Sequence, residues 1–380
     1  KLTKYQGNKS IKIGIFVKIL AMLLEKDFIA TSYQSIESAS FEWSAPSNIA
    51  LVKYWGKKER QIPANPSISF TLNNCKTVTK VEVVKRSENN DFSFDLLFEG
   101  KPKEDFKPKI QKFFERIEQF CPFLKEYHFK IDTQNTFPHS SGIASSASGM
   151  AALAMNIMSL EKAINPSISD DYFYAKASFL ARLGSGSACR SIKGKVVVWG
   201  NHAEISGSSD LFGVEFSAIH QNFKNYQDTI LLVDKGEKQV SSTVGHDLMH
   251  NHPFAERRFT QAHENLSKIK AILSSGNVAE FIKIVESEAL TLHAMMMTSM
   301  PYFILMKPNT LEIINKIWKN RTETQVPVCF TLDAGANVHV LYPENVKEHV
   351  LQFIQNELIE YCQNGQYICD EIGNGAKQSK

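Results

Sequence analysis

The sequence has few cysteines, little excess of one charge and no long apolar run, and each shortage excludes a class of protein. Its six cysteines lie far apart and none forms a CxxC pair. Structural zinc sites need closely spaced ligands and secreted scaffolds need denser cysteine, so we expect free thiols in a reducing cytoplasm. The 43 Lys and Arg residues are scattered and nearly balance 40 Asp and Glu residues, which excludes the basic stripe that a nucleic-acid partner requires.

The most apolar stretch near the N-terminus, "IGIFVKILAMLL" at residues 13–24, is interrupted by Lys18. A membrane-spanning helix needs about 20 apolar residues, so we expect no membrane association from this run. The basic flank suits a signal peptide, but Lys18 breaks the apolar core and no small-residue cleavage site follows. We therefore expect Met22 to be the native start and residues 1–21 to be extraneous or translated from upstream sequence. The intact mass of protein made from the native gene tests this, and a product that begins before Met22 contradicts it.

Hydrophobic periodicity divides the rest of the chain into two mixed halves. Alternating apolar positions predict strands, and longer amphipathic stretches predict helices. In the first half we expect strands at residues 41–43, 49–54, 67–72, 77–84, 92–98 and 194–200, and helices at 107–120, 149–160 and 171–183. In the second half we expect strands at 228–234, 328–334 and 339–343, and helices at 253–273, 278–297, 310–320 and 346–362. No fixed-period repeat appears. The pattern predicts an α+β fold with an N-terminal lobe at 22–220 and a C-terminal lobe at 221–380, divided near residues 215–227.

One loop, "PHSSGIASSASG" at residues 138–149, contains five serines and two glycines and runs directly into an apolar helical stretch. Glycine and serine are typical of flexible linkers. A helix N-terminus, however, presents unpaired N–H groups that suit an anionic phosphate. The loop lacks the Walker pattern, and from these residues alone an ordinary serine-capped helix is as plausible as a phosphate site.

The loop resembles the ATP-binding motif P-x-x-x-G-[LI]-x-S-S-[AG] of the galacto-, homoserine, mevalonate and phosphomevalonate kinase superfamily. The positions that fill the motif are Pro138, Gly142, Ile143, Ser145, Ser146 and Ala147. The resemblance implies a two-lobed fold with the active site in the cleft between the lobes, and a role for ATP with Mg²⁺. The residues that it implies for ATP binding are Pro138, Ser141, Gly142, Ser145, Ser146, Ser148 and Ser242.

Four further blocks, in the expected order, resemble signatures of the diphosphomevalonate decarboxylase family. They are "SAPSNIALVKYWGKKE" at 44–59, "GSGSACRS" at 184–191, "SSTVG" at 241–245 and "LDAGAN" at 332–337. The substrate-binding residues that the resemblance implies are Asn48, Tyr54, Trp55, Gly56, Lys57, Ser185, Gly186, Ser187, Ala188, Cys189, Arg190 and Thr243. Many members place an arginine on the substrate diphosphate just before the third strand, and residues 95–100 contain no counterpart. The resemblance also implies a homodimer.

Three residues carry the chemistry that this resemblance implies. In a strand at 49–54, Lys53 shares a face with Ile49 and Leu51, so it either snorkels to the surface or needs a buried anion. Asp333 follows an apolar strand, and as an isolated residue it is more typical of a turn than of a site. Arg190 offers a planar grip on carboxylate or phosphate, or forms a surface ion pair. The resemblance favours the catalytic interpretation of Asp333, Lys53 and Arg190.

The function that the resemblance implies is ATP-dependent decarboxylation of (R)-5-diphosphomevalonate to isopentenyl diphosphate. The alternatives are a decarboxylase of 5-phosphomevalonate, a mevalonate 3-kinase, or a non-catalytic ligand sensor on the same fold. Metal ligands are not identified: the spacing of His246 and His250 suits metal binding, but no carboxylate partner accompanies them, so we interpret both as loop or helix-cap residues.

Overall fold

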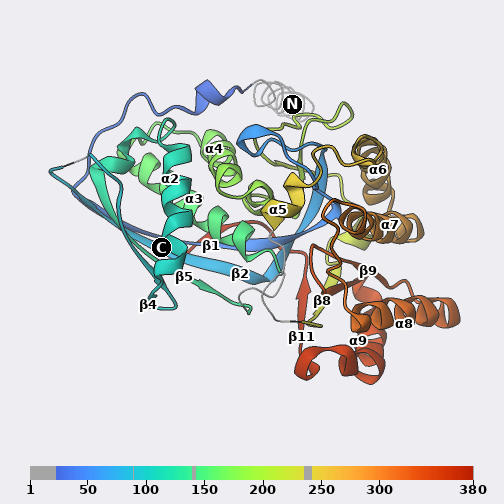
Figure 1. Ribbon diagram of the computed structural model, residues 1–380. Helices are drawn as coiled ribbons and strands as arrows, with labels where there is room; N and C mark the ends of the chain where they lie inside the picture. The colour runs from blue at the N-terminus through green and yellow to red at the C-terminus, as the bar shows by residue number, and fades with distance from the viewer. Residues whose placement is uncertain (1–22, 89, 139–142, 235–241, 380) are drawn as a thin grey trace, which may run out of the picture.

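The computed structural model describes residues 23–88, 90–138, 143–234 and 242–379. It contains two β-sheets, with helices packed against both (Figure 1). The expected start at Met22 and the segment before it lie outside the described residues. Among the described residues, no helix has both the length and the hydrophobicity needed to cross a bilayer.

Two long antiparallel strands, β1 (Ser38–Val52) and β2 (Ser67–Lys85), form the centre of the larger sheet. β5 (Tyr127–Asn135) pairs with β2 and runs parallel to β3 (Ser93–Phe98). The shorter strands are β4 (Lys101–Pro102), β6 (Val196–Trp199), β7 (Val214–Glu215) and β12 (Lys377–Gln378). Because β12 pairs with β1, the end of the chain returns to the first sheet.

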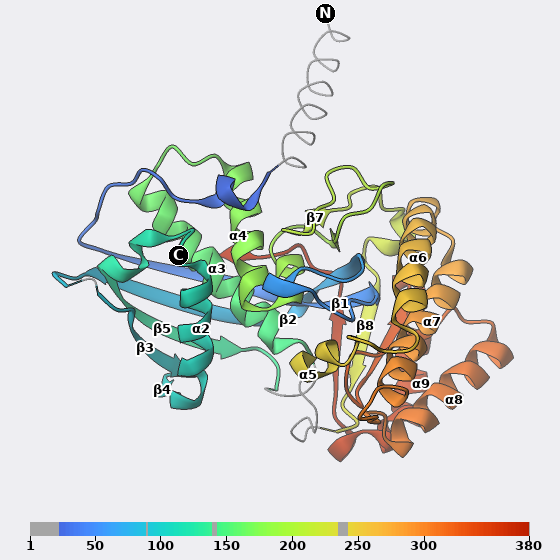
Figure 2. The same ribbon diagram turned by 45° about the horizontal axis from the view of Figure 1, so that its top comes forward.

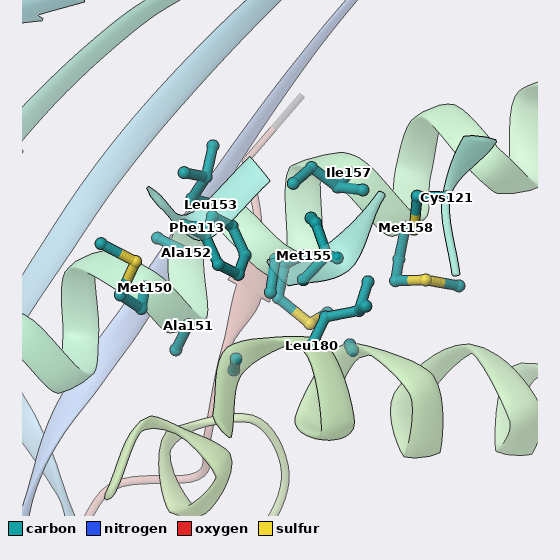
Figure 3. Packing of buried hydrophobic residues seen from close by; sticks show 14 of the residues in the cluster. Phe113, Cys121, Met150, Ala151, Ala152, Leu153, Met155, Ile157, Met158 and Leu180 are labelled. Carbon is teal, nitrogen blue, oxygen red and sulfur yellow. The ribbon is translucent and has the colours of Figure 1, made fainter. Parts of the chain in front are cut away.

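Three helices cover one face of this sheet (Figures 1 and 2): α2 (Lys107–Ile117), α3 (Ser145–Ile164) and α4 (Asp170–Gly184). α3 packs against β1, β2 and α4, and is apolar around most of its circumference, as a helix enclosed on several sides must be. Figure 3 shows its Met150, Leu153 and Met155 beside Phe113 of α2 and Leu180 of α4, all of one buried cluster. This packing fixes the direction of the α3 N-terminus.

The second sheet has the strand order β11-β8-β10-β9. Its strands are β8 (Gln227–Leu231), β9 (Cys329–Thr331), β10 (Val338–Tyr342) and β11 (Tyr367–Glu371). The helices of this half are α5 (Ser242–Asp247), α6 (Ala255–Ser275), α7 (Val278–Met297), α8 (Pro308–Thr324) and α9 (Lys347–Phe353). α7 packs against both β9 and β1, so it connects the two sheets.

The α+β class is confirmed, and the main differences from prediction concern continuity. β1 and β2 are each one strand where the sequence predicts two, because the pairing shifts register between Pro46 and Asn48. There β1 continues past its proline, and β2 continues from Thr71 to Lys76. The prediction omits β5, although Phe129 and Ile131 alternate with polar residues there. The helix expected at 346–362 ends at Phe353, where a π-helical turn (Ile354–Leu358) replaces it.

Candidate active site

A cavity of about 710 Å³ lies where the two halves meet. Its wall is built from the end of β1, the strands β2, β3 and β5, the helix α2, the start of α3, the segment 184–190, α5, α7 and the turn after β9. α5 lies between the two halves in Figure 2. The predicted site residues that line this cavity are Lys53, Tyr54, Trp55, Lys57, Ser145, Ser146, Ser185, Gly186, Ser187, Arg190 and Asp333.

Lys53 and Asp333 form an ion pair in this cavity. The Lys53 Nζ lies 3.2 Å from Asp333 Oδ1; the lysine side chain is only 2% exposed, whereas the aspartate is 29% exposed. Burial lowers the pKa of Lys53, and the neighbouring Asp333 carboxylate opposes that shift. Lys53 follows the last residue of β1 instead of lying within the strand, yet it points inward, so it does not snorkel to the surface. Asp333 therefore supplies the anion that an inward lysine requires.

The backbone of Lys53 is held by a buried ion pair between Arg258 of α6 and Glu288 of α7. Glu288 Oε2 accepts the Lys53 N–H at 2.8 Å, and Arg258 Nη2 donates to the Lys53 carbonyl at 3.2 Å. The carboxylate and guanidinium contact each other at 2.5 Å with no exposed side-chain surface. Asn265 donates a further hydrogen bond of 2.6 Å to Glu288. Both polar groups of the Lys53 peptide backbone are thus fixed from the second half of the chain.

Asp333 is fixed from the same helix. His293 Nε2 of α7 lies 3.1 Å from the Asp333 backbone carbonyl, and since a carbonyl only accepts, the imidazole donates. Burial lowers the pKa of His293 to about 4, so the ring is neutral near pH 7. Glu288 and His293 are not among the residues predicted from the sequence. The available signal was the placement of ionisable residues among the apolar positions of the 278–297 helix.

Arg190 lines the same cavity and is oriented by two side chains. Its Nη1 donates to Ser67 Oγ, and its Nε donates to Asn48 Oδ1 at 3.3 Å. Asn48 in turn donates to the Ser187 carbonyl at 3.1 Å. Burial lowers the pKa of Arg190, although a guanidinium keeps its charge. Asn48 therefore holds Arg190 from behind.

Four of the predicted substrate-binding residues lie outside the cavity wall formed by the described residues: Asn48, Gly56, Ala188 and Cys189. Cys189 is buried and its thiol donates to the Gly186 carbonyl at 3.0 Å, and burial raises its pKa to about 12. Such a thiol remains protonated and unreactive at neutral pH. Ala188 and Cys189 belong to the turn Gly186–Ser191, whereas Asn48 lies in β1 and Gly56 follows it.

The segment 54–57 contacts α5 through His246. The Gly56 N–H donates to His246 Nδ1 at 3.0 Å, and the imidazole lies against the rings of Tyr54 and Trp55 with centroid distances of 4.2 and 4.7 Å. Lys57 Nζ lies 3.4 Å from Asp247. The interpretation of His246 as a loop or cap residue is wrong: it lies within α5, is buried and lines the cavity.

The start of α3 forms the other end of the cavity. Ser145 and Ser146 line it, and Lys109 Nζ of α2 donates to Ser146 Oγ at 2.8 Å. Ser148 is buried behind them, 2.6 Å from the Thr77 hydroxyl. Ala144 has a φ of 45°, which turns the chain sharply into the helix. Lys109 was not identified from the sequence, because a lysine on a polar helix face carries no distinctive signal.

The remaining predicted ATP residues and Thr243 are placed only in part. Pro138 is exposed and lies outside the wall formed by the described residues. Ser141 and Gly142 lie outside the described residues. Ser242 and Thr243 belong to α5, but the description does not extend to their side chains. Within the described part of the chain, no group of three or more His, Cys, Asp or Glu side chains is arranged to hold a metal ion.

The fold resembles that of solved small-molecule decarboxylases. A mevalonate diphosphate decarboxylase from Staphylococcus aureus is 27% identical and matches with a TM-score of 0.77, over 90% of this chain and 98% of that chain. A structure described as MDDEF in complex with MVAPP, AMPPCP and magnesium is 28% identical and matches with a TM-score of 0.76, over 90% of this chain and 99% of that chain. The chain thus has the two-domain fold of the galacto-, homoserine, mevalonate and phosphomevalonate kinase superfamily.

Family models narrow the assignment within that class. A diphosphomevalonate decarboxylase-like N-terminal domain matches residues 45–210, and a mevalonate 5-diphosphate decarboxylase C-terminal domain matches residues 229–378. The diphosphomevalonate decarboxylase of Eremothecium gossypii is 30% identical over 79% of this chain and 76% of its own length. That of Debaryomyces hansenii is 29% identical over 82% of this chain and 81% of its own. The chain belongs to the diphosphomevalonate decarboxylase family.

Proposed function

We propose that this protein is an ATP-dependent decarboxylase that converts (R)-5-diphosphomevalonate to isopentenyl diphosphate, ADP, phosphate and CO₂. The observation that supports this activity most directly is the buried Lys53–Asp333 ion pair, which lies in one cavity with Arg190. A proton acceptor with a fixed counter-charge needs a carboxylate open to the substrate and a cation held beside it. Asp333 opens to the cavity, and Lys53 beside it is only 2% exposed.

ATP is needed because a tertiary hydroxide is a poor leaving group, whereas phosphate leaves readily. The C3 hydroxyl oxygen forms a bond to the γ-phosphorus while ADP leaves and the hydroxyl proton passes to Asp333. The phosphate then departs with the electron pair of its C–O bond, leaving a cation-like centre at C3. The bond between the carboxylate carbon and C2 breaks, and its electron pair forms the double bond as CO₂ is released.

Each charged group has a distinct task in this scheme. Asp333 accepts or orients the hydroxyl proton, and Lys53 keeps Asp333 ionised and balances charge on the transferring phosphoryl group. Arg190 grips the substrate carboxylate. Tyr54 and Lys57 bind the substrate phosphates. Ser185 and Ser187 bind substrate along the same wall, and the other predicted members of the 184–190 segment support them.

ATP fits the end of the cavity formed by α3. The helix N-terminus supplies unpaired N–H groups, and Ser145, Ser146 and Lys109 supply donors for phosphate oxygens. Pro138, Ser141, Gly142, Ser148 and Ser242 are proposed to complete the ATP loop, and Thr243 the substrate wall. Mg²⁺, when bound, neutralises phosphate charge, and nucleotide phosphates and water normally supply most of its ligands. We assign no protein ligand to it.

The 5-phosphomevalonate decarboxylase is the second candidate. Asp95 stands in the stretch where the family commonly has its diphosphate arginine, and its carboxylate lies 3.4 Å from His128. Among the described lining residues, the cations are Lys53, Lys57, Lys109 and Arg190. The retained Lys53–Asp333 pair argues against a 3-kinase and against a non-catalytic sensor.

A homodimeric state and a cytoplasmic location remain part of this proposal.

One assay separates these functions. Purified protein is given ATP, Mg²⁺ and, in separate reactions, diphosphomevalonate, phosphomevalonate or mevalonate, and ADP and CO₂ are measured together. Equal ADP and CO₂ with diphosphomevalonate are expected. ADP without CO₂ identifies a kinase, and turnover of phosphomevalonate alone identifies the second candidate. Binding of a mevalonate phosphate without either product identifies a sensor.

A further inference from the structure

His246 has a place in the cavity wall that the reaction scheme does not use. The residue is 9% exposed, lies in α5 and packs against Tyr54 and Trp55, which follow β1. The cationic groups Lys57 and Arg190 lie near enough to lower its pKa. Its ring thus forms part of the surface that faces an anionic substrate.

The hydrogen bond from Gly56 decides which ring nitrogen carries the proton. A backbone N–H donates to His246 Nδ1 at 3.0 Å, so Nδ1 is unprotonated. Burial lowers the pKa of His246 to about 3, so the ring is neutral near pH 7 and its single proton resides on Nε2. Within the described part of the chain, no group is hydrogen-bonded to Nε2.

The backbone on both sides of the hydrogen bond is closely packed. Gly56 has a φ of +98°, a region that disfavours other residues, and a Cβ built there would lie 3.0 Å from the ring of Phe259. Gly245, the residue before His246, is equally confined, since its Cβ would lie 2.5 Å from Trp55. A side chain at Gly56 or Gly245 would therefore disturb the hydrogen bond between Gly56 and His246.

We propose that His246 is a substrate-binding residue whose Nε2–H donates a hydrogen bond to a phosphate oxygen of the mevalonate phosphate, beside Tyr54 and Lys57. The proposal rests on the proposed function. His246 acts as a neutral donor and not as a base, because its one basic nitrogen is occupied by Gly56. It supplies specificity without adding charge, and it keeps this role throughout the neutral pH range.

Two substitutions separate the two nitrogens of the ring. His246→Asn retains an acceptor near the Nδ1 position for the Gly56 N–H but has nothing at Nε2, whereas His246→Gln carries an amide nitrogen near the Nε2 position. A hydrogen bond to a charged group corresponds to roughly a tenfold change in affinity or more. We expect His246→Asn to raise the KM for diphosphomevalonate about tenfold, with kcat and the KM for ATP nearly unchanged, and His246→Gln to recover part of the loss.

His252 offers a matched control. Its Nδ1 also accepts a backbone N–H, from Phe254 at 3.1 Å, but its Nε2 lies 3.1 Å from the Met295 carbonyl and the residue is outside the cavity wall. His252→Asn should leave the KM for diphosphomevalonate unchanged. Thermal unfolding of each variant verifies that it is folded.

The outcomes are distinct. An unchanged KM for diphosphomevalonate in folded His246→Asn overturns the proposal, as does an equal rise in the KM for ATP. If His246→Asn does not fold, His246→Leu decides, because it also lacks a donor: a rise of about tenfold in the KM for diphosphomevalonate supports the Nε2 donor, and an unchanged KM contradicts it. Absence of turnover by the wild-type protein with any mevalonate phosphate contradicts the proposed function, and in that case isothermal titration of wild type and His246→Asn with diphosphomevalonate tests the donor alone.

Discussion

Asp333 differs from an ordinary turn aspartate in having a buried ammonium group 3.2 Å from its carboxylate. Asparagine supports the same turn but cannot accept a proton or pair with Lys53. We expect Asp333→Asn to retain its fold and its affinity for ATP and to lower kcat by at least about 10²-fold. ADP and CO₂ release should fall together, measured in the coupled assay, because phosphorylation precedes loss of the carboxylate.

A matched control is Asp105→Asn, which removes an exposed carboxylate paired with Lys103 on the surface. That variant should turn over at the wild-type rate. CO₂ release near the wild-type rate in Asp333→Asn, or ADP release that continues without CO₂, would show that the role given to Asp333 is wrong.

Arg190 is fixed through two of its three guanidinium nitrogens, by Asn48 and Ser67. A lysine keeps the charge but cannot reproduce this planar set of donors. Leaving a substrate carboxylate without its partner in a desolvated site costs roughly 2–5 kcal/mol. We expect Arg190→Lys to lower kcat/KM, measured by steady-state kinetics, by the factor that corresponds to this free energy. Near-normal kcat/KM in this variant would mean that another group binds the carboxylate.

At the scale of elements, α7 sets the distance between the two reacting side chains. Its Glu288 holds the Lys53 backbone and its His293 holds the Asp333 backbone, although Lys53 and Asp333 follow strands of different sheets. A residue that follows the end of a strand has no neighbouring strand to hydrogen-bond its backbone, so other groups must hold it. A single helix that contacts both ends therefore defines the geometry of the ion pair.

This arrangement predicts that stability and activity can be separated. Glu288→Gln leaves the Arg258 charge buried and unpaired, and should lower the free energy of unfolding by roughly 3–5 kcal/mol. The double variant Arg258→Met with Glu288→Met removes both charges and should recover most of that stability in urea unfolding. Its kcat should nevertheless stay low, because the Lys53 backbone is no longer held. Recovery of kcat together with stability would show that the pair only stabilises the fold.

The sequence predicts the charged residues of the cavity better than the residues that hold them in place. Signatures that resemble known blocks identified Lys53, Arg190 and Asp333, which the structure brings to one cavity. Glu288 lies 235 positions along the chain from the backbone group that it holds, and His293 lies 40 positions from its own partner. No local pattern encodes such contacts, because they depend on how two sheets pack.

The same distinction holds for the elements. Periodicity located most helices, since each has a buried face of its own. It divided β1 and β2, because residues such as Pro46 interrupt the alternation where a bulge lets the strand continue. Periodicity predicted two mixed halves, and the family resemblance added that the active site lies in the cleft between them.

At the scale of the whole molecule, two buried imidazoles tie stability to pH. Burial lowers the pKa of His293 to about 4 and that of His246 to about 3, from an ordinary value of 6.5. Below pH 6.5 the unfolded chain binds protons at these rings while the folded chain does not. The free energy of unfolding therefore falls as the pH drops from 6.5 towards 4, and this contribution is fully present above pH 7.

One pKa unit corresponds to about 1.36 kcal/mol, so between pH 7.5 and pH 5 the two rings together should remove up to about 4 kcal/mol. Urea unfolding at both pH values measures this loss. His293→Gln keeps a donor for the Asp333 carbonyl but does not titrate, so we expect it to lose about half as much of this contribution. If the free energy of unfolding of His293→Gln falls as much between pH 7.5 and pH 5 as that of wild type, other groups cause the acid sensitivity. The substitution removes only the proton that the His293 imidazole binds on unfolding.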